Sequence, residues 1–86
     1  MLKVVHVTWN DPSFAGSGWM TQSDFQEWVK ADTAVSDSVG ILAYENPSFI
    51  VLIQSVGTKQ VADGLKISRS AIRSIQELGE VPISLG

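Results

Sequence analysis

The chain of 86 residues has no cysteine, a formal net charge of −3, 44% hydrophobic residues and 17% charged residues. This composition is typical of one globular domain, and it excludes both a disulfide framework and a thiolate metal site. Six Lys and Arg residues against nine Asp and Glu residues argue against a surface that binds duplex nucleic acid.

The hydropathy pattern also bears on localisation and domain organisation. The longest unbroken apolar run covers residues 49–53, far fewer than the roughly 20 residues that cross a membrane. The N-terminal residues do not have the pattern of a secretory signal. We therefore expect a cytoplasmic protein without a membrane partner, built as a single domain over 1–86, with a compact core over 1–78 and a C-terminal tail over 79–86.

The first predicted element is a strand over residues 2–9, "LKVVHVTW". Alternation places Lys3, Val5, Val7 and Trp9 on one face, which is the more apolar and is expected to be the core face. Asn, Asp, Pro and two Gly residues follow within residues 10–18, a composition that indicates a loop.

The segment "MTQSDFQEWVKAD", residues 20–32, predicts a short helix. Thr21 followed by Asp24 has the spacing of a capping box. Phe25, Trp28 and Val29 share one face at i, i+3 and i+4, so Trp28 is expected to be a core residue.

The rest of the chain predicts strands. "SVGILAYE" and "SFIVLIQS" flank the turn "ENPS", and "LKI", the tight turn "SRSA" and "IRSIQEL" complete the series. Because both faces of "FIVLI" are apolar, we expect one of them to contact another subunit. On that view Ile50→Asp or Leu52→Asp, whichever residue faces away from the core, should disrupt an oligomer.

The predicted fold is mostly β (α+β), with five short strands and one short helix inserted after the first strand. Five strands are too few for a sandwich. They suit a small, bent SH3-like or Sm-like barrel, or an open α+β sheet.

The spacing "V-x-W-x-D-x-x-S-x-x-G-W", followed by "SVG-x-L", "VL-x-QS" and "I-x-x-x-x-I-x-SI-x-EL", resembles a family of small uncharacterised proteins of tailed bacteriophages. The resemblance extends over residues 4–78. It implies a phage origin and a compact β fold, and it implies no reaction.

Few residues suggest catalysis. His6 is the only histidine and has no metal-ligand spacing around it. A serine nucleophile needs a base held by an orienting acid, so a pairing of His6 with Ser13 or Ser17 is only a formal alternative. Asp11 and Asp24 could act as acid and base or hold Mg²⁺, but they are better explained as a turn residue and a helix cap. We therefore expect no enzyme, no cofactor and no metal site.

Two tryptophans, Trp9 and Trp19, flank the glycine-containing loop. Both could anchor the loop by packing, or their indole faces could line a cleft beside polar loop residues. We expect Trp9 to be structural and Trp19 to face a ligand, with "KISRSAIR" supplying either a solvated turn or a cationic rim. The candidate ligand-binding residues are Trp19, Asn10, Asp11, Ser13, Ser17, Arg69 and Arg73.

The leading hypothesis is a non-enzymatic, phage-encoded binding protein in the host cell cytoplasm. It would be a homo-oligomer that holds a small nucleotide-like ligand between subunits, as a sponge for a nucleotide-derived signal of bacterial immunity. The alternative is an Sm-like or SH3-like adaptor that binds a host protein or single-stranded RNA. The small number of basic residues in the chain favours a protein partner over RNA. A virion component is a third hypothesis.

Overall fold

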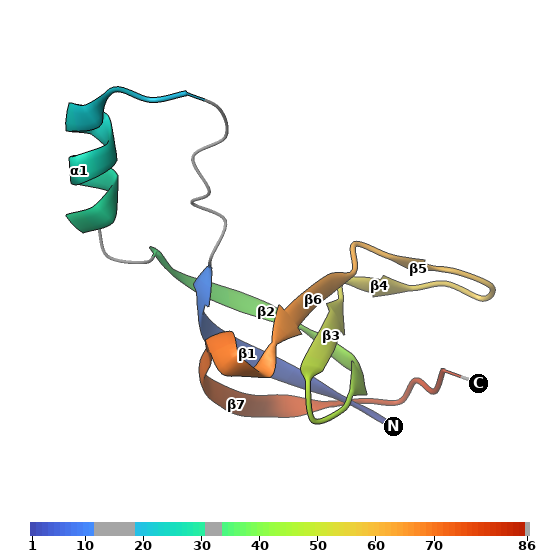
Figure 1. The fold of residues 1–86 in the computed structure, drawn as a ribbon. Helices are drawn as coiled ribbons and strands as arrows, with labels where there is room; N and C mark the ends of the chain where they lie inside the picture. The colour runs from blue at the N-terminus through green and yellow to red at the C-terminus, as the bar shows by residue number, and fades with distance from the viewer. Residues whose placement is uncertain (12–18, 31–33, 86) are drawn as a thin grey trace.

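The computed structural model describes residues 1–11, 19–30 and 34–85, in which strands predominate (Figure 1). In chain order the elements are β1 (Leu2–Asp11), α1 (Gln22–Lys30), β2 (Ala34–Glu45), β3 (Phe49–Ile53), β4 (Ser55–Val56), β5 (Val61–Ala62), β6 (Leu65–Ser68), the 3₁₀ helix η1 (Arg69–Ala71) and β7 (Ile72–Val81).

Five strands form one antiparallel sheet in the order β6-β3-β2-β1-β7, and β4 and β5 form a separate hairpin. The mostly β fold, and the short helix that follows the first strand, are therefore confirmed. The sheet is not closed as a barrel, because β6 and β7 remain its two edges. The connection η1 turns the chain from one edge to the other without bringing the two strands into register. The open sheet is the alternative that the structure supports.

The core lies on one face of this sheet. Val5 and Val7 of β1 are fully buried, as their alternation predicts, and Trp9 packs against them. Ile50 and Leu52 of β3 are each 1% exposed and belong to the same cluster. The expectation that one of these two residues faces another subunit is therefore wrong, because both fill the core of their own chain.

Gly40 of β2 lies on the core face opposite Val5, and it is required there by close packing. A Cβ atom at this position would lie 3.2 Å from the Leu52 Cβ and 3.2 Å from the Ile53 carbonyl oxygen. Gly40 therefore lets the end of β3 approach β2 closely at this position.

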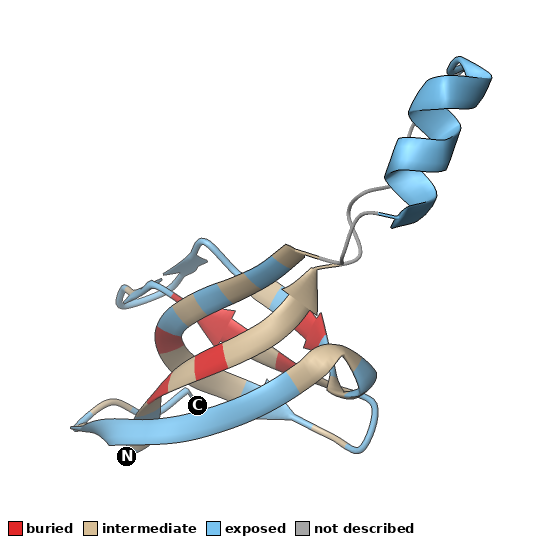
Figure 2. Ribbon diagram, turned by 90° about the vertical axis from the view of Figure 1, so that its left-hand side faces the viewer, coloured by how far each residue is buried: buried red, intermediate tan, exposed pale blue. Residues whose placement is uncertain are grey.

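The helix α1 begins as the sequence predicts. The Asp24 backbone N–H donates to the Thr21 side-chain oxygen at 3.0 Å, and the Phe25 N–H donates to the Thr21 carbonyl at 2.9 Å. The prediction for Trp28 is wrong: it is 44% exposed, and α1 buries none of its residues. Two views at right angles show why, since α1 stands away from the sheet and its apolar face does not reach the core (Figures 1 and 2).

The C-terminal strand is longer than expected. β7 runs to Val81, and Gly79, Glu80 and Val81 pair with the start of β1. Part of the predicted tail thus belongs to the sheet, because residues 2–4 of β1 offer their edge to it.

Candidate functional site

The segment of residues 19–30, which we call the arm, carries the most exposed aromatic side chain of the described chain. Trp19 is fully exposed at 105%, so the explanation of Trp19 as a packing anchor does not hold. It precedes α1, whose Phe25 and Trp28 rings contact each other with centroids 6.2 Å apart. The arm therefore presents aromatic faces to its surroundings.

Polar residues lie where β1 leads toward the arm. Asn10 and Asp11 are half-buried and pair with Val35 and Ala34 at the start of β2. These two predicted site residues therefore lie at the base of the arm. Ser13 and Ser17 lie outside the described residues.

Trp9 has the structural role that we expected. Its ring packs against the core cluster, and its Nε1–H donates to Ser38 Oγ on the neighbouring strand at 3.0 Å. Burying most of an indole while its N–H bonds to a partner is how tryptophan is accommodated in a core. Trp9 thus holds the end of β1 to β2 and fixes the origin of the arm.

A bulge in β7 places Arg73 close to the C-terminal end of β1. Thr8 pairs with Ser74 and Trp9 with Ile72, so Arg73 is the extra residue between the two pairs. Its side chain is exposed. Arg73 is therefore the basic residue of the predicted rim that the sheet places beside Trp9.

Arg69 is placed differently. Its Nε donates to the Asn46 carbonyl at 3.0 Å and its Nη2 to Glu45 Oε1 at 3.2 Å. Its backbone N–H also donates to the Ser48 carbonyl at 2.9 Å. Of the two alternatives for this segment, the solvated turn does not describe Arg69, and its contacts with the β2–β3 turn engage the guanidinium that was predicted to bind a ligand.

We predict that Arg69→Ala lowers the free energy of unfolding by about 1–2 kcal/mol, since it removes two side-chain hydrogen bonds of a charged donor at a half-buried site. Arg73→Ala is the matched control and should change it by less than about 0.5 kcal/mol. Urea denaturation of both variants measures the difference. Equal stabilities of the two variants would contradict the assigned role of Arg69.

A polar cluster that the sequence did not reveal lies on the opposite face of the sheet. Asp37 Oδ1 accepts a hydrogen bond from Thr8 Oγ1 at 2.8 Å and lies 2.9 Å from His6 Nε2. Alternation along β1 did place His6 and Thr8 on one face, but only the β1–β2 register brings Asp37 between them. Within the described residues no hydrogen bond joins Thr8 to His6, so this geometry is not that of a nucleophile activated by a base.

The hydrogen bond from Thr8 is the largest cause that lowers the pKa of Asp37, followed by the hydrogen bond from His6. A lowered pKa means that Asp37 adds stability above its unfolded-state pKa, about 4, and that this stability is lost as the pH falls through the folded-state value. We predict that Thr8→Val raises the pKa of Asp37, as followed by NMR titration of the carboxyl carbon. An unchanged titration would show that Thr8 does not stabilise the carboxylate.

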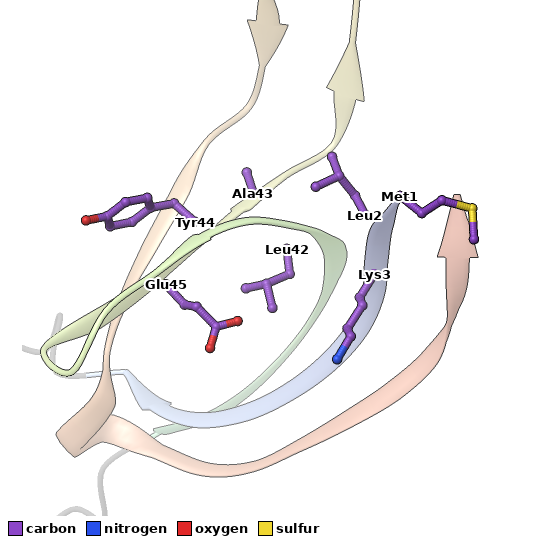
Figure 3. Close-up of a pocket in the computed structure, with 7 residues that line it drawn as sticks. All are labelled: Met1, Leu2, Lys3, Leu42, Ala43, Tyr44 and Glu45. Carbon is purple, nitrogen blue, oxygen red and sulfur yellow. The ribbon is translucent and has the colours of Figure 1, made fainter. Parts of the chain in front are cut away.

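The structure also has a hollow of about 320 Å³ between the start of β1 and the end of β2 (Figure 3). Its volume is at the low end for small-ligand sites. Lys3 Nζ is 3.8 Å from Glu77 Oε2, and Glu45 binds Arg69, so ion pairs already engage its charged groups. The lining residues are Met1, Leu2, Lys3, Leu42, Ala43, Tyr44 and Glu45. The hollow contains none of the predicted site residues.

The fold and the site together define a small, mostly β protein with an antiparallel five-stranded sheet and an exposed aromatic arm. Comparison with protein-family models, curated proteins and solved structures finds no match to this chain. Over the described ranges no helix is long and apolar enough to span a membrane. The same ranges hold no group of three or more His, Cys, Asp and Glu residues that could bind a metal ion.

Proposed function

We propose that this chain is a non-enzymatic binding protein whose arm contacts a small nucleotide-like ligand. The observation that carries the proposal is the full exposure of Trp19. An exposed indole face binds planar rings by stacking, at about 1–3 kcal/mol per base in proteins that bind single strands. A tryptophan that served only the fold would be packed, as Trp9 is.

The groups at the base of the arm suit the polar part of such a ligand. Asn10 and Asp11 offer hydrogen-bonding side chains, and the exposed Arg73 offers a planar guanidinium, which fits phosphate oxygens. With Arg69 bound to the β2–β3 turn, Arg73 is the arginine that remains for this role.

The arm of a single chain stands away from the sheet, and ligand sites bury most of the ligand surface (Figure 2). We therefore propose that a second copy of the chain completes the site, so that the ligand is held between subunits. The resemblance to phage proteins suggests a use for such a protein in the host cytoplasm, as a sponge for a nucleotide-derived signal of bacterial immunity.

The test is a thermal-shift screen of the purified protein against cyclic dinucleotides and ADP-ribose derivatives, together with mass spectrometry of any small molecule that co-purifies. The proposal expects at least one compound to raise the melting temperature in the parent and to fail in Trp19→Ala. A flat response to every compound, with no co-purified molecule, would contradict it.

One observation favours a second function, an adaptor that binds a host protein. Phe25, Trp28 and Val29 form an apolar face on α1 and are 51%, 44% and 59% exposed. Amphipathic helices use such faces to bind protein grooves. An adaptor would retain a stoichiometric host protein that Phe25→Glu no longer binds, whereas a sponge would retain a small molecule in both forms.

A further inference from the structure

The strand β7 is a long edge strand of the sheet. One side of β7 pairs with β1, and no strand of residues 1–11, 19–30 or 34–85 pairs with its other side. Residues 73–80 of this strand are all exposed (Figure 2). An edge of this length offers a row of backbone N–H and C=O groups to another strand.

The sequence of β7 is complementary to itself in one antiparallel register. Two copies that extend the sheet about a two-fold axis must place residues of the same face opposite each other, so only every second register is possible. With Ile75 on the axis, Ile75 faces Ile75 of the partner subunit. Arg73, the bulge residue, then faces the partner's Glu77, whose carboxylate also lies 3.8 Å from Lys3 Nζ of its own chain. The apolar pair Ile75–Ile75 and the oppositely charged pair Arg73–Glu77 are both favourable cross-strand pairs.

On the other face, Ser74 and Gln76 pair within the chain with Thr8 and His6, and the proposed register places Ser74 opposite the partner's Gln76. Each polar residue thus meets a polar one. Bulges at Arg73 and Leu78 interrupt the regular alternation at the two ends of this segment.

The neighbouring registers lack this match. A shift by two residues in one direction places Ile75 opposite the partner's Glu77, and in the other direction opposite the partner's Arg73. A further shift by two residues in the first direction places Glu77 opposite Glu77 of the partner subunit. Like charges directly opposite each other are destabilising.

We propose that β7 pairs antiparallel with β7 of a second copy, centred on Ile75, to join two sheets into one. The pairing over residues 73–77, between the bulges at Arg73 and Leu78, would form about four to six backbone hydrogen bonds. This β7–β7 pairing rests on the proposed function, because it would bring in the second copy of the chain that the proposed ligand site requires. A guanidinium has five N–H donors, so an Arg73 that binds the partner's Glu77 keeps donors for a ligand at the subunit junction.

The first test measures mass by light scattering over a range of protein concentrations. The parent should approach twice the 9.3 kDa mass of one chain. Arg73→Glu and Glu77→Arg should each weaken the dimer about tenfold or more, because each places like charges opposite each other twice, and the double variant should restore it. Glu80→Arg makes the same charge change outside the paired residues and should leave the dimer intact.

The second test uses the absence of cysteine from the chain. Ile75→Cys should form a disulfide-linked dimer under mild oxidation, since directly opposed residues have Cα atoms about 4.5–5.5 Å apart, within disulfide range. Glu77→Cys is the control, because in this register the Cα atoms of the two substituted residues would lie about 14 Å apart, from an offset of four residues at about 3.3 Å each and about 5 Å between the strands.

A parent that stays at 9.3 kDa at every concentration would overturn the pairing. Equal crosslinking of the two cysteine variants, or a charge-swapped double variant no tighter than the single variants, would overturn the register. These tests use no ligand. A dimer that binds none of the screened compounds would contradict the proposed function and leave the pairing standing. A monomer that binds one would overturn the pairing and the placement of the ligand between subunits, and leave ligand binding by the arm standing.

Discussion

Leu52→Asp and Ile50→Asp should each unfold the chain. Both side chains are 1% exposed and lie in the cluster formed with Val5, Val7 and Ile67. A carboxylate there would lose its hydration without a partner, and the lost packing adds to the cost, together about 4–5 kcal/mol or more. Domains have about 5–15 kcal/mol of stability in total, and a domain this small lies toward the lower end. Circular dichroism and urea denaturation measure the loss.

Val51→Asp provides the control on the same strand. Val51 lies between Ile50 and Leu52, points to the opposite face and is only half-buried. We expect this variant to remain folded with a smaller loss of stability. Folded Leu52→Asp and Ile50→Asp variants that only change their oligomeric mass would instead support the subunit contact that the apolar pattern of "FIVLI" suggested.

The second large effect separates Trp9 of β1 from Trp19 of the arm. Trp9→Ala should lower the free energy of unfolding by about 3–5 kcal/mol, because it leaves a cavity beside the core cluster and removes the hydrogen bond to Ser38. Trp19→Ala should leave the melting temperature within a few degrees of the parent, because the fully exposed indole contributes little to packing. Thermal unfolding of both variants under the same conditions makes the comparison.

Trp9→Phe refines this prediction, since it keeps an aromatic ring in the core and removes only the indole N–H. Its loss should be clearly smaller than that of Trp9→Ala. A Trp19→Ala variant as unstable as Trp9→Ala would make Trp19 a packing residue and remove the basis of the proposed site.

The elements that depend on local pattern could be predicted from the sequence. The alternation of β1 identifies Val5 and Val7 as core residues, and Thr21 with Asp24 marks the start of α1, because both signals lie within a few neighbouring residues. Closure of the barrel depends instead on whether β6 and β7 meet, which no local pattern encodes. The exposure of Trp28 follows from where α1 stands relative to the sheet, so its helical spacing alone gave the wrong answer.

The candidate site was predictable only in part, for the same reason. The loop composition of residues 10–18 pointed to Asn10, Asp11 and the flanking Trp19 as candidates, although Asn10 and Asp11 lie at the end of β1. The separation of Arg69 from Arg73 depends on contacts with the β2–β3 turn, 23 and 24 residues away along the chain. The link from His6 to Asp37 crosses 31 residues and needs the register of two strands.

Calorimetric titration of the compound identified in the thermal-shift screen into the parent and Trp19→Ala is the most direct test that the arm binds a ligand. The result we predict is at least a tenfold loss of affinity in Trp19→Ala, which corresponds to about 1.4 kcal/mol, with an unchanged melting temperature of the free protein. Equal affinities of the parent and a stably folded Trp19→Ala variant would contradict the account.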